Sequence, residues 1–490
     1  MKHEKWAEAL NEISDRHIVE ASQKKHRPWR WAAPVAAVLA AAILGSLWLP
    51  TLAGRAKETL QQDTTGSTIS SNPDIMRPYL LSNVQYPKVA AYPAEYEEKA
   101  YDAWWEQQRA LRDQPEGYAD SLEQYWGNLL CKLMEDSGKE NFACSPVNIY
   151  MALAMLAETT GGESRQQLLQ LLNADSIEDL RTQAGYVWEA HYNNDGLSTS
   201  ILSNSLWLKD GCVYDQKTID LLSDSYYAAT FQGALGSDEM NQVLQAWLDE
   251  QTGGLLTEQA ENMELDPRSV LALASTVYYQ VQWRDEFNEE RNTEQTFRGP
   301  SGKSKETFMN RQLSYGPYYW SDNFGAVHLE LEDGSRMWLI LPDEGTTPVQ
   351  LLQSGEVTDF LAQHPAWYES TWENKKDLIV NLSVPKFDVS SSLDLCDKLK
   401  ELGVTDIFGS DADFTPIMPK DDAFIGQIQH AARVGIDEKG VTAAAFTVID
   451  YCGAGMPPEE EMDFVLDRPF LFLIESQDDL PLFAGIVNEP

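Results

Sequence analysis

The stretch FVLDRPFLFLI (residues 464–474), followed by PLFAGIVNEP (481–490), decides the fold of this chain, because it is the chain's most specific motif. Two further apolar segments lie upstream, SVLALASTVYYQVQW (269–283) and RMWLILP (336–342). Short apolar runs of this kind are typical of strands that are buried on both faces. We therefore predict buried strands at both upstream segments.

Helical patterns precede these strands. The segment SLEQYWGNLLCKLMED (121–136) has apolar residues at helical spacing, and NIYMALAMLAET (148–159) predicts a buried helix that ends at Gly161 and Gly162. Helices and strands interleave without the regular spacing of βαβ units. The sequence therefore predicts an α+β fold.

Length, composition and charge limit the possible functions. A chain of 490 residues predicts one large domain with appendages. Its 43% hydrophobic content is ample for a packed core. The formal net charge of −40 argues against nucleic acid or heparin as a partner, because polyanions bind through basic patches. The five cysteines include no CxxC pair, and their odd number excludes a complete disulfide framework.

Enzyme signatures are missing from the sequence. There is no GxSxG nucleophile elbow and no HExxH, and the seven histidines are not paired at metal-ligand spacing. The string GPSGKS resembles part of a phosphate-binding loop, but Phe297 stands where that loop needs its first glycine. We therefore predict no catalytic residue, no metal site and no cofactor.

The N-terminal region predicts a membrane anchor. Residues 1–30 carry mixed charges and end in a basic cluster, whereas residues 31–49 (WAAPVAAVLAAAILGSLWL) carry none. A helix of that length spans about 28 Å, close to the hydrocarbon core of a bilayer. Because the positive flank is N-terminal, residues 1–30 should stay in the cytoplasm and everything after residue 50 should be exported. A cleaved signal peptide and a buried core helix are the alternatives.

Residues 50–120 are predicted to be a linker and an N-terminal extension. The part at 61–74 (QQDTTGSTISSNPD) is poor in apolar residues and is typical of a flexible linker. The part at 86–120 is rich in tyrosine and tryptophan, and we expect it to form a helix that packs on the main domain.

Together these segments resemble the serpin family of serine protease inhibitors. FVLDRPFLFLI fits the C-terminal signature of that family at every position, and PLFAGIVNEP resembles its terminal strand. Five more blocks are similar: NFACSPVNIYMALAML (141–156), LSNSLWLKDG (202–211), TVYYQVQWRDEF (276–287), VPKFDVSSSLDLCDKLKELGVTDIFGSDADFTPI (384–417) and IQHAARVGIDEKG (428–440). They occur in the family's order within residues 121–490, the predicted serpin domain.

The resemblance implies a fold of three β-sheets and eight or nine helices, with an exposed reactive loop. It also implies a mechanism in which a protease cleaves the loop and becomes acylated. The freed strand then inserts into the central sheet and distorts the protease. We expect a bacterial, membrane-anchored member of the family that is not an enzyme.

The residues of the hinge of the reactive loop favour an inhibitory serpin over a non-inhibitory one. By resemblance it comprises Glu438, Gly440, Val441, Thr442, Ala443, Ala444, Ala445 and Thr447. Inserted residues alternate between the two faces of a sheet, so every second one should face the core. These core-facing residues are Val441, Ala443, Ala445 and Thr447. None is charged, so the row can enter the sheet without burying a charge. The bulky Phe446 should point outward.

The loop length usual in the family puts the reactive bond between Ala454 and Gly455. Other positions remain open: Tyr451, Cys452, Gly453 and Met456. A small residue before the scissile bond fits proteases with shallow specificity pockets, so elastase-like or subtilisin-like serine proteases are the expected partners. Cys452 is either a bystander or an exposed thiol with a redox role.

The resemblance also assigns positions in the body of the domain. Ser145, Asn148 and His430 match the family's shutter, the hydrogen-bonded centre of the sheet. Lys386 and Glu438 match a salt bridge at the breach, the end of the sheet where insertion begins, beside Trp283. Gln245 stands where we expect relatives to carry an asparagine of the shutter region.

We therefore expect a single-pass protein of the cell membrane whose serpin domain is extracellular and traps serine proteases. The main alternative is a non-inhibitory serpin that acts as a binding or structural surface protein. A transmembrane sensor, in which residues 1–30 bind a cytoplasmic partner, is a third interpretation.

Overall fold

The fold was determined as a computed structural model. It describes residues 73–93, 97–115, 117–261, 263–363, 366, 370–420, 423–441, 458 and 460–490. All of them belong to one compact unit, Ile69–Pro490. The predicted anchor at residues 31–49 lies outside the described residues. Within the described ranges, no helix is both long and apolar enough to cross a membrane.

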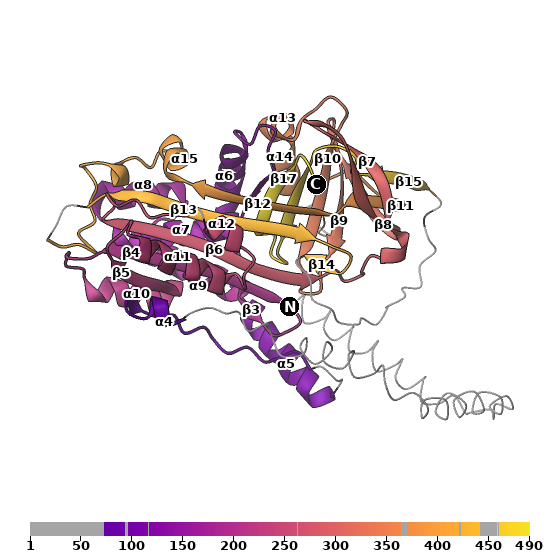
Figure 1. The fold of residues 1–490 in the computed structure, drawn as a ribbon. Coiled ribbons are helices and arrows are strands. Elements are labelled where there is room, and N and C mark those ends of the chain that lie inside the picture. Colours follow the sequence, from indigo (N-terminus) through magenta and orange to yellow (C-terminus); the bar gives the residue numbers. More distant parts are fainter. Residues whose placement is uncertain are drawn as a thin grey trace, which may run out of the picture. The chain divides into compact units, whose positions relative to one another are not determined.

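The first sheet has eight strands and forms the centre of the unit (Figure 1). Its order is β1 (Leu80–Ser82), β5 (Ala228–Gly233), β4 (Thr199–Lys209), β6 (Leu271–Gln282), β14 (Gly440–Val441), β13 (Ile425–Ile436) and β12 (Phe387–Asp394), with β3 (Asn193–Asn194) paired to β4. The buried strand predicted at 269–283 is therefore β6. It lies in the middle of this sheet.

The second sheet has nine strands. Its order is β15 (Glu461–Val465), β11 (Lys375–Pro385), β8 (Gly302–Trp320), β9 (Phe324–Glu330), β10 (Arg336–Pro342), β16 (Phe470–Glu475), β17 (Pro481–Val487) and β2 (Phe142–Cys144), with β7 (Thr293–Gly299) paired to β8. The strand predicted at 336–342 is β10, and the two C-terminal motifs form β16 and β17.

The expectation of three sheets is wrong for the described residues, in which the ladders join into two. The reason is the length of β8, which has 19 residues. It pairs with β7 and β11 along most of its length, and Tyr319 and Trp320 at its end pair with β9. This last contact joins what would otherwise be two separate sheets.

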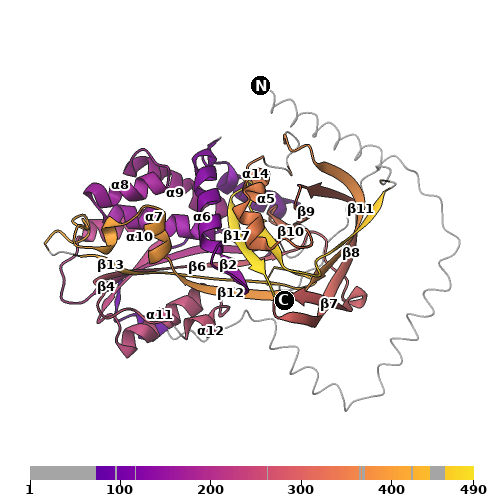
Figure 2. The same ribbon diagram turned by 90° about the horizontal axis from the view of Figure 1, so that it is seen from above.

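Helices cover both faces of the first sheet (Figure 2). The described residues contain twelve α-helices: α4 (Pro73–Met76), α5 (Glu98–Arg112), α6 (Glu123–Met134), α7 (Pro146–Thr159), α8 (Gly162–Leu171), α9 (Ile177–His191), α10 (Gln216–Tyr226), α11 (Asp238–Gln251), α12 (Thr257–Ala260), α13 (Pro348–Gln353), α14 (Glu356–Leu361) and α15 (Cys396–Glu401). The expectation of eight or nine concerns the serpin domain at 121–490, where the described residues form ten helices, α6 to α15. Four of these ten have six residues or fewer. Three single 3₁₀ turns complete the set: η1 (Asp120–Leu122), η2 (Glu289–Arg291) and η3 (Asp406–Phe408).

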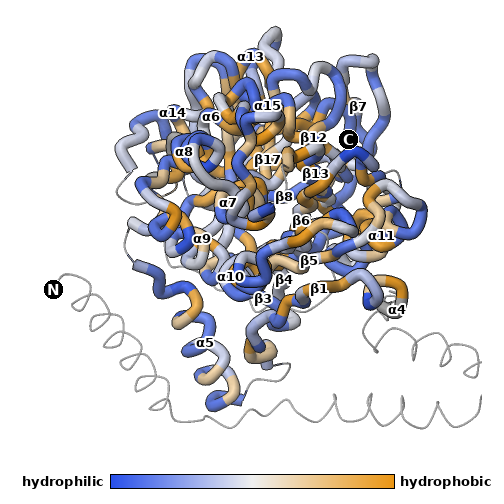
Figure 3. Tube along the Cα trace, turned by 90° about the vertical axis from the view of Figure 1, so that its left-hand side faces the viewer, coloured by the Kyte–Doolittle hydropathy of each residue, from blue (hydrophilic) through white to orange (hydrophobic). Residues whose placement is uncertain are grey.

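Helix α7 is the central helix behind the first sheet. Ser145 caps it through a hydrogen bond from the Asn148 backbone N–H, and Pro146 occupies its first turn, where no amide hydrogen is needed. Every residue of α7 is buried. The large core lies around α7, whereas a smaller core lies between the sheet and α11 on the opposite face. In Figure 3 the strands inside the unit carry hydrophobic colour, while α5 is mostly hydrophilic.

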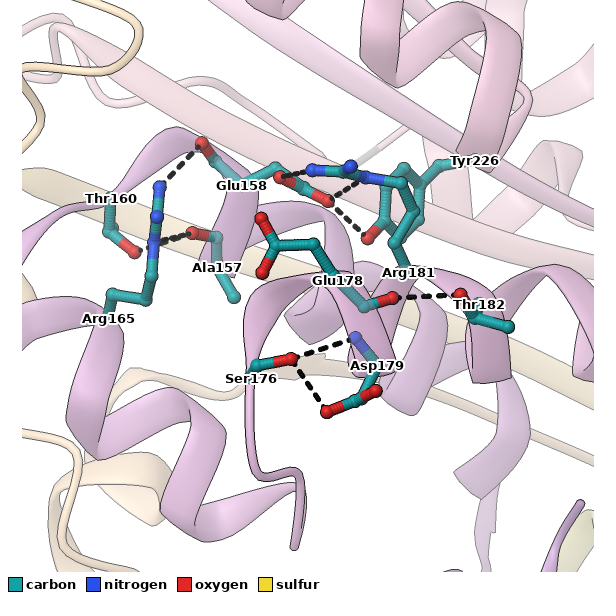
Figure 4. A network of polar contacts seen from close by, with 10 residues as sticks. All are labelled: Ala157, Glu158, Thr160, Arg165, Ser176, Glu178, Asp179, Arg181, Thr182 and Tyr226. Atoms are coloured by element: carbon teal, nitrogen blue, oxygen red, sulfur yellow. Dashed lines mark hydrogen bonds and ion pairs between the residues drawn. The ribbon is translucent and has the colours of Figure 1, made fainter.

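An ion pair with a buried carboxylate and a half-buried arginine joins α7 to its neighbours α9 and α10 (Figure 4). The carboxylate of Glu158, 4% exposed, accepts two hydrogen bonds from Arg181, at 2.7 and 2.8 Å, and one from the Tyr226 hydroxyl at 2.8 Å. A buried carboxylate is stable only when it is paired in this way. The pair therefore fixes the position of three helices that meet behind the sheet.

The segment that precedes α6 packs on this unit. Strand β1 pairs with β5 and so extends the edge of the first sheet. Tyr86 stacks on Trp188, Tyr192 and Tyr227. The helix expected within residues 86–120 is present as α5, and its Trp104 side chain is buried.

Candidate functional site at the centre of the first sheet

Strands β6 and β13 are paired at one end and separated at the other. They run parallel and pair directly from Ile425 and Leu271 up to Ala431 and Thr276. Beyond this point β14 lies between them, antiparallel to both. Within the described part of the chain, residues 277–280 of β6 and 432–435 of β13 have no partner strand on the sides that face each other. This arrangement leaves a position for one antiparallel strand.

A tight turn places β14 in this position. The side chain of Asp437 accepts hydrogen bonds from the backbone N–H groups of Lys439 and Gly440, at 2.8 and 3.1 Å. A Cβ atom at residue 440 would lie 2.3 Å from the carbonyl oxygen of Val281, so only glycine allows this close approach to β6. The next residue, Val441, is 1% exposed and belongs to the large core.

The residues assigned to the breach lie together beside this turn. The Trp283 indole donates to the carbonyl oxygen of Asp437 at 2.8 Å, and the Nζ atom of Lys386 lies 2.6 Å from a carboxylate oxygen of Glu438. Asn292 donates to the same oxygen. Burial acts to raise the pKa of Glu438, but the hydrogen bonds from Lys386 and Asn292 outweigh it, so the pKa is lowered. These contacts hold the entrance of the hinge against the sheet.

The residues assigned to the shutter meet where β6 and β13 are still paired. His430 on β13 lies opposite Ser275 on β6. The Ser145 backbone N–H donates to Nε2 of His430 at 3.0 Å, and Nδ1 lies 3.2 Å from the Ser275 hydroxyl. Because Nε2 accepts, the neutral ring must carry its proton on Nδ1 and donate to Ser275. Burial lowers the pKa of His430 to about 3, so the ring is neutral at physiological pH.

Two asparagines lie at the shutter with unsatisfied amides. Both polar side-chain atoms of Asn148 are buried and have no hydrogen-bond partner among the described residues. The same holds for Asn204, which lies on β4 directly opposite Ser275. Buried polar groups without partners are destabilising. The shutter therefore combines one satisfied contact, at His430, with two unsatisfied side chains.

Sequence reasoning missed Ser275 and Asn204. Each is a polar residue inside an otherwise apolar strand segment, which was the available signal, but their proximity depends on strand register. The assignment of Gln245 to the shutter region is wrong. Gln245 lies on α11 and donates to the carbonyl oxygens of Glu261 and Met263. Its contacts tie α11 to the chain around α12.

The rest of the reactive loop lies outside the described residues. This holds for Thr442, Ala443, Ala444, Ala445, Thr447, Tyr451, Cys452, Gly453, Ala454, Gly455 and Met456. The structure describes the start of the loop, at β14, and the strand that follows the loop, β15. In the described ranges no group of three or more His, Cys, Asp or Glu side chains is placed to hold a metal ion.

Protonation of His430 predicts a measurable pH dependence. Its pKa of about 3 lies below the usual 6.5, so the unfolded state binds the proton more readily. The stability that His430 contributes is complete above about pH 6.5. It should fall by about 1.4 kcal/mol per pH unit as the pH is lowered toward 3. Comparing denaturant unfolding of wild type and His430→Gln between pH 7.5 and 5 isolates this slope, because the carboxylates are the same in both. Parallel pH profiles would contradict the assignment.

The structure thus places the start of the loop, a gap that has room for one strand, and a hydrogen-bonded centre at His430 along the same two strands, β6 and β13. The sequence profile described as Serpin (serine protease inhibitor) matches residues 122–490. The chain belongs to the serpin family. Its general activity is therefore protease inhibition, which is not a catalytic activity.

Relatives of known name agree with this placement. The chain is 29% identical to leukocyte elastase inhibitor of Sus scrofa over 379 residues, covering 74% of this chain and 97% of that protein. It is 24% identical to alpha-1-antiproteinase of Rattus norvegicus, covering 76% and 89%. The crystal structure of the thermophilic serpin tengpin in its native state superposes with a TM-score of 0.67, at 24% identity over 82% of this chain and 98% of tengpin.

Proposed function

We propose that this serpin inhibits an extracellular serine protease by suicide trapping. The protease cleaves the reactive loop near Ala454 and Gly455, and the freed strand inserts between β6 and β13. One observation carries the proposal: β14, the first two residues of the loop, already pairs with both strands.

Extending the β14 ladder residue by residue gives the register of insertion. Each core-facing residue then lies between two buried residues of the flanking strands: Ala443 between Tyr279 and Val434, Ala445 between Val277 and Ala432, and Thr447 between Ser275 and His430. The first two of these sites are apolar and suit alanine. At the third, the hydroxyl of Thr447 would replace the contact between Ser275 and His430. Insertion thus opens the shutter and leaves a hydroxyl in its place.

The free energy gained on insertion is comparable with the cost of holding a protease in a distorted state. A full strand of about a dozen residues adds about a dozen ladder hydrogen bonds, each worth roughly 1 kcal/mol net. Burial of the core-facing side chains adds to this. Together these gains can offset the cost of holding an acylated protease in a distorted state.

Incubation of the full-length protein with a panel of serine proteases tests the proposal. We expect covalent adducts that survive denaturing electrophoresis, formed with elastase-like or subtilisin-like enzymes. The small residue at 454 supports this choice of partner, as does the name of the porcine relative, an elastase inhibitor. Loop cleavage without any adduct would favour the alternative, a non-inhibitory serpin that serves as a binding or structural protein.

We also propose that the domain is displayed outside the cell on a single membrane helix. The support is the charge-free segment 31–49 with its basic N-terminal flank. Protease added to intact cells should then release a fragment that begins after residue 50. Recovery of the full-length chain from the soluble cytoplasm would contradict this topology.

A further inference from the structure

Helix α5 closes a small cavity that contains a buried histidine. The cavity has a volume of about 40 Å³, which is room for about one water molecule. Its wall includes Gln108 and Arg112 of α5, His191 at the end of α9, Asp333 between β9 and β10, and Asp478 between β16 and β17. Helix α5 thus touches both the helix behind the first sheet and two turns of the second.

His191 is neutral and only half satisfied in this cavity. It is 6% exposed, and its Nδ1 atom lies 2.5 Å from the carbonyl oxygen of Val187. Because a carbonyl can only accept, Nδ1 carries the proton and Nε2 is bare. Nε2 is buried and has no hydrogen-bond partner among the described residues. A second proton on the ring would have to enter at Nε2.

The same helix is held by residues that follow His191 closely in the chain. The Trp104 indole donates to the side chain of Asp195 at 3.0 Å. The Gln108 amide donates to the side chains of Asn193 at 3.1 Å and Asp195 at 3.3 Å. A change in the charge of His191 therefore occurs close to Asn193 and Asp195, the residues whose side chains bind α5.

We propose that α5 and this cavity form an acid-released clasp, closed while His191 is neutral and opened when His191 gains a proton. Clasp here means α5 together with its contacts to Asn193, Asp195 and the cavity. Opening it exposes the imidazolium to water.

The surroundings of His191 determine whether acid strengthens or weakens the docking of α5. Burial lowers the pKa of His191 from its usual 6.5, and Arg112 acts in the same direction. The hydrogen bond to Val187 raises the pKa, as do Asp478 and Asp333, each of which accepts a tyrosine hydroxyl, but together they do not overcome the effect of burial. The closed state therefore binds the proton less readily than the open state. Docking of α5 is strongest above about pH 6.5 and weakens as the pH falls below it.

Opening the clasp has a consequence for the sheet. Asn193 and Asn194 form β3, which pairs with the start of β4, and Thr199 of β4 pairs with Gln280 of β6. The clasp thus ties the β6 side of the gap to the turns of the second sheet. We infer that its release lets β6 move away from β13 more easily, so that acid speeds insertion. This consequence rests on the proposed function, whereas the clasp itself does not.

Hydrogen exchange of the full-length protein at pH 7.5 and 5.0, corrected for intrinsic rates, tests the clasp. We expect the protection of α5 to fall about tenfold or more at the lower pH in wild type, because protons then favour the open state over the closed one. In His191→Gln it should fall less than about twofold. Gln108→Ala, the matched control, should reduce protection at both pH values. An equal fall in wild type and His191→Gln, or no fall in wild type, would overturn the proposal.

Two charge variants keep the test decisive if His191→Gln does not fold. Arg112→Gln should shrink the acid effect and Asp478→Asn should enlarge it, because they remove opposite charges near the ring. If both variants changed the acid effect in the same direction, the proposal of the clasp would be overturned. The rate of adduct formation with a subtilisin-like protease at pH 7.5 should be higher in Gln108→Ala than in wild type. If no adduct forms at all, the proposed function fails while the exchange result still decides the clasp.

Discussion

Val441→Arg is expected to leave cleavage of the reactive loop intact and to turn most of the inhibitor into a substrate. Val441 is already buried between β6 and β13, at 1% exposure, so an arginine there should drive β14 out of the gap. Insertion would then have to bury an unpaired guanidinium at a cost of several kcal/mol. Each 1.4 kcal/mol that enters the barrier of insertion slows it about tenfold. Hydrolysis of the acyl-enzyme, which competes with insertion, should then win.

The matched control is arginine at the neighbouring position. Continuing the ladder places Thr442 beside Gln280 and Gly435, which are both partly exposed, so Thr442→Arg should keep most of the inhibition. Position 446 is less suitable, because its partners would be Thr276 and Ala431, which are buried. The ratio of cleaved inhibitor to covalent adduct on a denaturing gel measures the effect. Equal ratios in wild type and Val441→Arg would mean that trapping does not depend on insertion.

Ala454→Arg is expected to redirect the inhibitor from elastase-like to trypsin-like proteases. A shallow pocket rejects a long cationic side chain, whereas a deep pocket with a carboxylate at its base binds it. The ratio of the two trapping rates should change by about a hundredfold or more. The peptide released from the wild type should begin at Gly455. If it begins after Met456, the assignment of the reactive bond is wrong, and Ala454→Arg should then leave both rates nearly unchanged.

Motifs in the sequence predicted individual strands and helices, because each motif is a local pattern. The C-terminal motif became β16 and β17, and the apolar runs became β6 and β10. Trp283, Lys386 and Glu438 lie together in the structure although about 150 residues separate the first from the last. Their proximity followed from the resemblance and could not have been derived from composition or periodicity.

What the sequence could not supply was register between distant strands. Ser275 meets His430 and Asn204 only because β6 pairs in a fixed alignment with both neighbours. A shift by one residue would turn Ser275 to the other face. Gln245 is a different case, because it lies on α11 and not on a strand. The need for strand register also explains the sheet count, since Tyr319 and Trp320 alone pair β8 with β9.

The two residues of β14 remove the slowest part of building a new strand. Starting a ladder normally requires closing a loop and fixing an alignment before any contact compensates for the lost freedom of the chain. Here the Asp437 turn has closed that loop, and Gly440 and Val441 have selected one alignment. In the proposed mechanism, growth of the strand would therefore be a propagation step without nucleation. Once the loop is cut, insertion should follow a single exponential without a lag.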